Sequence, residues 1–142
     1  MMNNKNFTLW NRITAVVVSL IAAVTYLVTI EPTASFWDCG EFIASSYKLE
    51  VGHPPGNPVF QLFARLFTMF GDTLHAAVAV NAFSALCSAL TIFFLYLTIV
   101  FFFFFLVKPS ADGTYTVAKA IAVFGSGAVG ALAYTFCVTF WF

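Results

Sequence analysis

The chain has 142 residues, of which 61% are hydrophobic and only 8% are charged. A soluble globular domain carries roughly 25% charged residues, so this composition excludes an ordinary soluble domain. The formal net charge is zero and the basic residues form no cluster, which excludes the phosphate-neutralising surface that nucleic-acid binding requires. We therefore expect an integral membrane protein whose immediate partner is the lipid bilayer.

The first apolar segment is Ile13–Ile30, a run of 18 uncharged residues. As a helix it would be about 27 Å long, close to the hydrocarbon thickness of about 30 Å. Lys5 and Arg12 precede it and Trp10 suits an interfacial anchor, so the positive-inside rule predicts a cytoplasmic amino terminus. A cleaved signal peptide is the alternative, because residues 33–35 are small. The run exceeds the usual apolar core of about 7 to 15 residues, which favours a retained anchor.

Residues 31–73 form a polar connection that we expect outside the membrane, on the extracytoplasmic side. A carboxylate at the bilayer centre costs about 3 kcal/mol, so a cluster of acids is excluded from hydrocarbon. Residues 31–50 hold four acids against the single base Lys48; the acids are Glu31, Asp38, Glu41 and Glu50. A short helix is predicted over 39–49 and a turn over 52–58, where glycine and proline gather. Phenylalanines spaced by three and four over 57–70 predict a second helix on the membrane surface, with a re-entrant or short spanning helix left open.

Two further spans complete the expected topology. Residues 74–107 contain no charged residue, glycine or proline, which predicts one unbroken helix. A cytoplasmic loop over 108–119 and a third span over 120–142 follow. The sequence thus predicts an all-α fold with three transmembrane helices in one multi-pass domain. Small polar residues recur along one side of the second span and are typical of helix packing; they are Asn81, Ser84, Ser88 and Thr91.

Residues 125–130 match the dinucleotide-binding pattern G-x-G-x-x-G. That pattern functions between a strand and a helix, with an acidic residue about 20 positions later. No acidic residue follows Asp112. We interpret the small residues spaced by four, Ser126 with Gly130 and Gly127 with Ala131, as a surface for close helix packing.

The segment 35–42 is the strongest chemical candidate. It places Asp38 and Glu41 three residues apart among aromatic residues. On a helix their Cβ atoms would lie within about 5 to 6 Å, so that one carboxylate could serve as a base. The alternative is a solvated pair that only ends a span. His53 lies in a stiff Gly-His-Pro-Pro-Gly turn, where it could orient a phosphate or hydroxyl or have a structural role.

A divalent metal bound by Asp38, Glu41 and His53 is left open, although their spacing matches no known ligand signature. We assign no metal and no cofactor. Arg65, alone among aromatic residues, could pair with a lipid phosphate or extend its charged end to the membrane interface.

Several segments together carry a family resemblance. They are Glu31-Pro32-Thr33, Ser35-Phe36-Trp37-Asp38-Cys39-Gly40-Glu41-Phe42-Ile43-Ala44, Tyr47-Lys48-Leu49, Val51-Gly52-His53-Pro54-Pro55-Gly56-Asn57-Pro58, Ala133-Tyr134-Thr135-Phe136 and Thr139-Phe140-Trp141-Phe142. The chain resembles the bacterial domain-of-unknown-function 2723 family. That family is related to the animal transmembrane protein 260, a protein O-mannosyltransferase, and is placed with the GT-C glycosyltransferases.

The resemblance implies a multi-pass glycosyltransferase of the cytoplasmic (inner) membrane. Such an enzyme would transfer a sugar, mannose in the related protein, from a polyprenyl-phosphate donor to serine or threonine hydroxyls of exported proteins. GT-C enzymes keep an acidic residue in the first extracytoplasmic loop, where this chain has Asp38 and Glu41. The resemblance makes Asp38 the expected base, with Glu41 tuning or replacing it. Trp37, His53 and Arg65 are the expected substrate-binding residues.

The resemblance has a departure, because Cys137 and Val138 stand where relatives commonly have a small polar residue and an acid. The chain is expected to be an amino-terminal fragment, inactive without the remaining transmembrane helices. Two other functions stay open. One is a transporter or flippase fragment whose stripe of small polar residues lines a path, and the other is a non-catalytic assembly subunit that binds partner helices.

Overall fold

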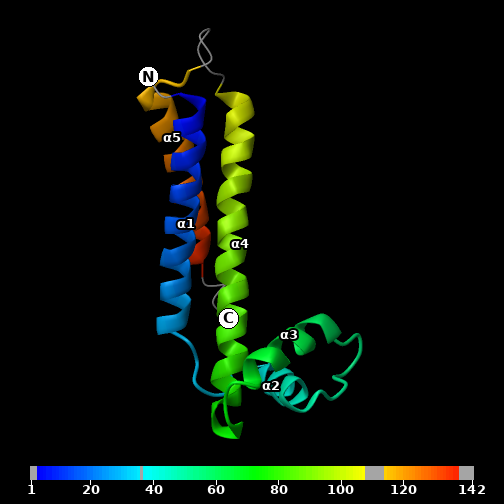
Figure 1. Ribbon diagram of the computed structural model, residues 1–142. Helices are drawn as coiled ribbons and strands as arrows, with labels where there is room; N and C mark the ends of the chain where they lie inside the picture. The colour runs from blue at the N-terminus through cyan, green and yellow to red at the C-terminus, as the bar shows by residue number, and fades with distance from the viewer. Residues whose placement is uncertain (1–2, 36, 108–113, 138–142) are drawn as a thin grey trace. The chain divides into compact units, whose positions relative to one another are not determined.

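A computed structural model describes residues 3–35, 37–107 and 114–137. Its regular elements are helices, as predicted (Figure 1). Three of them are long and apolar, and two shorter helices and a 3₁₀ turn lie between the first and the second of these in the chain. They are α1 (Asn4–Val28), α2 (Cys39–Lys48), α3 (Pro58–Thr68), η1 (Thr73–His75), α4 (Ala76–Leu106) and α5 (Val117–Thr135). The three long helices are long and apolar enough to cross a membrane, which makes this a multi-pass membrane protein.

The long helices differ from the predicted spans mainly at their ends. Helix α1 begins at Asn4, well before the uncharged run, and therefore includes Lys5 and Arg12. Long cationic side chains are tolerated there because they can extend their charged ends to the interface. Helix α4 is unbroken over 31 residues, which confirms the prediction of a single helix. The expectations for residues 108–113 and 138–142 lie outside the described residues.

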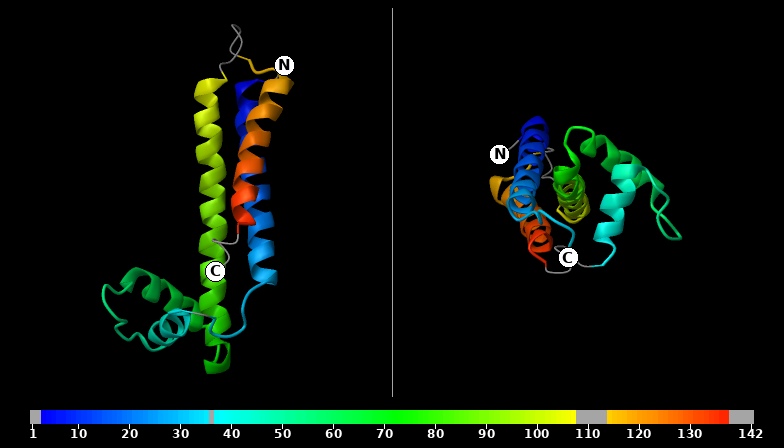
Figure 2. Two further views of the ribbon diagram at one scale, coloured as in Figure 1. Left: turned by 180° about the vertical axis from the view of Figure 1, so that it is seen from behind. Right: turned by 90° about the horizontal axis from the view of Figure 1, so that it is seen from below.

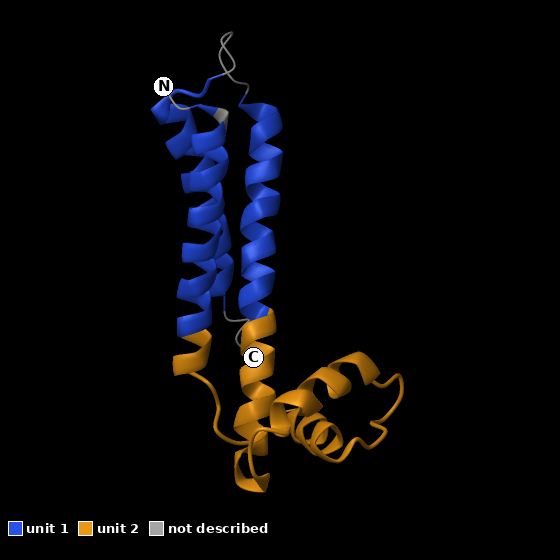
Figure 3. Cartoon of the chain, in the orientation of Figure 1, with its two compact units in different colours: residues 1–24, 88–142 blue, residues 25–87 orange. Residues whose placement is uncertain are grey.

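The chain divides into two compact units, which Figure 3 distinguishes by colour. The first comprises residues 1–24 and 88–142, and Figure 2 shows its parts of α1, α4 and α5 side by side. Aromatic rings close one end of this unit: the Phe7 ring lies 4.4 Å from Tyr115 and 4.7 Å from Phe124 between centroids. Farther along, the Ser19 hydroxyl donates to the Ala89 carbonyl at 2.9 Å. The hydroxyl thereby joins α1 to α4 and satisfies its own hydrogen-bonding need in an apolar setting.

The glycine-rich segment of α5 packs against α4 within this unit. A Cβ atom added to Gly127 would lie 2.7 Å from Val100 Cγ2 and 2.9 Å from Tyr96 Cε2. One added to Gly130 would lie 2.8 Å from Ile99 Cδ1. Both glycines lie inside a continuous helix, without the strand and turn that a dinucleotide site requires. The helix-packing interpretation is confirmed.

Replacing Gly127 by alanine is expected to destabilise the helix packing by about 1 to 3 kcal/mol, because the new methyl group overpacks the contact with α4. Gly125→Ala is the matched control, since a Cβ there meets nothing within 4 Å. Both changes improve helix propensity by a similar amount, so their difference isolates the contact. Unfolding of the two variants in detergent measures it. Equal stability of the two variants would contradict the packing of Gly127 on α4.

The second unit, residues 25–87, contains α2, α3 and the first part of α4. Helix α3 turns a partly polar face inward, since Gln61, Ala64 and Thr68 are buried. Its large apolar side chains are mostly exposed, including Val59, Leu62, Phe63 and Leu66. Part of the predicted phenylalanine stripe instead packs on α4, because Phe60 and Phe67 lie 5.3 and 5.1 Å from the Phe83 ring. A position of α3 on the membrane surface stays a prediction, and its outward apolar face agrees with it.

Asn81 of α4 fixes the segment that leads into α2. Its side-chain amide donates to the carbonyl oxygens of Glu31 at 2.9 Å and Thr33 at 3.2 Å. Its side-chain oxygen lies 3.8 Å from the Cys39 sulfur in the first turn of α2. This member of the small polar stripe therefore holds the backbone next to the candidate site.

Candidate active site

The candidate site begins where the chain enters α2. Trp37 adopts a left-handed backbone with φ of 62°, which costs a non-glycine residue about 1 to 2 kcal/mol, and its side chain is 97% exposed. Asp38 then takes the N-cap position, but its side chain makes no capping hydrogen bond. The Asp38 carboxylate thus remains available for a ligand.

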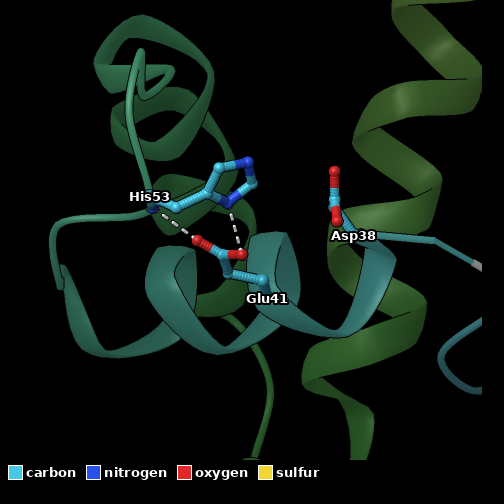
Figure 4. Close-up of side chains that lie close together, drawn as sticks. All are labelled: Asp38, Glu41 and His53. Carbon is cyan, nitrogen blue, oxygen red and sulfur yellow. Dashed lines mark hydrogen bonds and ion pairs between the residues drawn. The ribbon is translucent and has the colours of Figure 1, made fainter.

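Glu41 holds His53 through two contacts (Figure 4). Its Oε1 accepts the His53 backbone N–H at 2.7 Å, and its Oε2 pairs with the ring Nδ1 at 2.7 Å. The backbone hydrogen bond and then the ring hydrogen bond hold the pKa of the Glu41 carboxyl below its usual value. The same ring hydrogen bond, followed by the charges of Glu41 and Asp38, raises the pKa of His53 above 6.5. Each partner therefore stabilises the charged form of the other.

The three side chains line one pocket of about 230 Å³, formed by α2, the turn after it and the start of α3. Its lining residues are Asp38, Glu41, Phe42, Gly52, His53, Pro55, Gly56, Asn57 and Gln61. Glycine at position 52 lets the turn lie this close to the side chains of Glu41 and Gln61. A Cβ at that position would lie 3.0 Å from Glu41 Oε1 and 3.2 Å from Gln61 Nε2. The Gln61 amide in turn donates to the Ser45 hydroxyl at 3.0 Å. The pocket is thus built from residues of both short helices.

The same residues are the candidate ligand set for a metal. One ligand atom from each of Asp38, Glu41 and His53 lies within 4.8 Å of the other two. Carboxylate oxygens and imidazole nitrogen suit a divalent cation. However, both Glu41 oxygens already contact His53, so a cation bound at Nδ1 would have to replace the ring contact. The structure thus brings together the three residues of the metal alternative.

Arg65 and Trp37 are not among the residues that line this pocket. Arg65 Nη1 donates to the Tyr47 carbonyl near the end of α2, and the guanidinium lies 5.4 Å from the centroid of the Tyr47 ring. The Tyr47 carbonyl lies in the last turn of α2, where backbone carbonyls lack a partner within the helix, and Arg65 supplies that partner. The contact also links α3 to α2. Substrate binding by Trp37 and Arg65 stays a prediction.

Sequence reasoning missed the Glu41–His53 pair and the contribution of Gln61 and Asn57 to the pocket. Glu41 and His53 stand 12 positions apart on opposite sides of a turn. The available signal was Gly52 directly before His53, because a glycine often marks a close approach of the backbone to another group.

Comparisons with known proteins give a family match and a relative. Residues 38–142 match the family described as Protein O-mannosyl-transferase TMEM260 N-terminal domain. A protein of Dictyostelium discoideum, Protein O-mannosyl-transferase tmem260, is 29% identical over 86 residues, which is 59% of this chain and 10% of that protein. No solved structure matches.

The matched segment begins at Asp38 and includes Glu41, His53 and Arg65, whereas Trp37 lies just outside it. It also contains the helices α2 to α5, so it covers the whole candidate pocket and two of the three apolar helices. The chain belongs to the TMEM260 protein O-mannosyl-transferase family of membrane glycosyltransferases.

Proposed function

We propose that the full-length protein transfers mannose from a polyprenyl-phosphate donor to serine or threonine hydroxyls of exported proteins, in the pocket at the start of α2. The observation that carries this proposal is the Asp38 carboxylate, which lines the pocket without capping its own helix. Membership of a glycosyltransferase family supports the reaction class. The remaining transmembrane helices of the full-length protein complete the donor and acceptor sites.

Asp38 serves as general base in this reaction. It takes the proton of the acceptor hydroxyl while the hydroxyl oxygen forms a bond to the anomeric carbon of the sugar. The bond from that carbon to the phosphate oxygen breaks, and its electron pair leaves on the lipid phosphate. The products are the O-glycosylated side chain, the polyprenyl phosphate and a protonated Asp38, which returns its proton to water.

The pocket lies on the extracytoplasmic side of the bacterial cytoplasmic membrane. The candidate span of α1 ends at Val28, ten positions before Asp38, and Lys5 and Arg12 stand toward the opposite end of that helix. By the positive-inside rule, the amino terminus is cytoplasmic. The exposed apolar face of α3 would lie at the interface, the depth at which the phosphate of a lipid-borne donor is found.

A transfer assay tests the proposal with the full-length protein reconstituted in lipid. Labelled polyprenyl-phosphate mannose is supplied with a serine-containing peptide, and label is expected in that peptide but not in one with alanine at the same position. A nucleotide-activated sugar serves as the control donor and should give no transfer. Transfer from the nucleotide sugar would contradict the lipid donor, and no transfer from either donor would favour a non-catalytic assembly subunit.

A further inference from the structure

We propose that Glu41 and His53 act as one unit, in which Glu41 is a positioning residue and the Nε2 atom of His53 donates a hydrogen bond to the phosphate of the glycosyl donor. This inference rests on the proposed function and deepens it, because it assigns different roles to the two acids of the pocket. Asp38 handles the acceptor proton, and the Glu41–His53 unit binds the donor phosphate.

The geometry leaves one nitrogen of His53 for a ligand. The Glu41 carboxylate contacts both the backbone N–H and the ring Nδ1 of His53. Figure 4 shows the second ring nitrogen on the side of the ring away from Glu41. Because the carboxylate accepts a hydrogen bond from Nδ1–H, the ring is fixed in one orientation. Nε2, which donates when the ring carries both protons, is the nitrogen left to act in the pocket that His53 lines.

Charge explains why the pocket needs this pairing. Two unpaired carboxylates, Asp38 and Glu41, would repel an anionic donor from the pocket that they line. The contact with His53 cancels the charge of Glu41 when the ring is protonated, and it leaves Asp38 as the single unpaired anion among the described lining residues. As the donor bond breaks, negative charge grows on the leaving phosphate, and a cationic donor at Nε2 stabilises it.

The same contacts argue against Glu41 as a second base. Both of its oxygens are used by His53, and these hydrogen bonds lower the pKa of its carboxyl. A carboxylate with a lowered pKa is a weaker proton acceptor, which disfavours Glu41 as the base for the acceptor hydroxyl. Glu41 therefore acts through His53.

Binding of polyprenyl phosphate to the full-length protein tests this assignment separately from sugar transfer. His53→Gln and Glu41→Gln are each expected to weaken binding at neutral pH by about tenfold or more, the value of a charge-assisted hydrogen bond. The double variant should bind no more weakly than His53→Gln alone, because Glu41 works through the ring. Glu50→Gln is the matched control, since Glu50 is exposed, pairs with Lys48 at 3.8 Å and does not line the pocket.

The double variant distinguishes positioning from a merely structural role. Glu41 and Asp38 are the charged groups that face His53 in the pocket, while α3 contributes the neutral Gln61. If Glu41 acts only through the ring, its loss cannot add to the loss of the ring itself, whereas two independent effects on binding would add.

Several outcomes would overturn the inference while leaving the proposed function intact. One is normal transfer together with unchanged polyprenyl-phosphate binding in His53→Gln. Another is additive losses in the double variant. A third is binding that a chelator abolishes and Mn²⁺ or Mg²⁺ restores, which would make Asp38, Glu41 and His53 a metal site. Conversely, binding that needs both His53 and Glu41, in a protein that transfers no sugar, would support the phosphate site and overturn the proposed function alone.

Discussion

Replacing Asp38 by asparagine in the full-length protein is expected to lower sugar transfer by about 10²- to 10⁴-fold, the usual contribution of a general base. Asparagine has nearly the same size as aspartate, but its amide cannot take the acceptor proton. The Asp38 side chain makes no capping hydrogen bond that the change would remove, so helix α2 and membrane insertion should be unaffected. Initial rates of mannose transfer, normalised to the amount of inserted protein, measure the effect.

Two comparisons make the Asp38 result specific. Glu50→Gln removes an exposed acid of the same unit that pairs with Lys48, and it should retain the wild-type transfer rate. Polyprenyl-phosphate binding by Asp38→Asn should be retained or tightened, because the variant removes an anion from the pocket without touching the Glu41–His53 contacts. Wild-type transfer by Asp38→Asn would remove Asp38 from the mechanism, even if the protein remains a transferase.

The long helices could be predicted from the sequence because their signals are local. A run without charge, glycine or proline specifies a membrane helix almost by itself, and α4 is unbroken as that pattern predicts. The role of the glycines in α5 could also be predicted, because small residues spaced by four lie on one face of a helix. In the structure, Gly127 on that face contacts Tyr96 and Val100 of α4. The start of α1 was harder to predict. The helix begins at Asn4 and so includes Lys5 and Arg12, whereas the uncharged apolar run begins only after Arg12.

The site was predictable in part. The three-residue spacing of Asp38 and Glu41 placed both acids at the start of α2, as found. The contact of Glu41 with His53 depends instead on how the turn over 52–58 folds back onto α2, which no local pattern specifies. Arg65 illustrates the same limit. Its position on α3 brings it to the Tyr47 carbonyl, a tertiary contact that appears only once the two helices pack.

The orientation of the pocket across the membrane leads to an all-or-none prediction. In a protein whose native cysteines are replaced by serine, Val51→Cys should react with a membrane-impermeant maleimide in intact cells, because Val51 is 98% exposed and lies in the loop that carries the site. Val117→Cys, at the 56% exposed start of α5, should react only after the membrane is permeabilised. A single crossing by α4 requires the two positions to lie on opposite sides.

This labelling result bears directly on the chemistry. The proposed acceptors are exported proteins, so Asp38 can meet their hydroxyls only if the turn between α2 and α3 faces away from the cytoplasm. Reaction of Val117→Cys in intact cells, with Val51→Cys protected until permeabilisation, would invert the topology. The acid-bearing pocket would then face the cytoplasm, and transfer to exported proteins at Asp38 would have to be abandoned together with the orientation derived from Lys5 and Arg12.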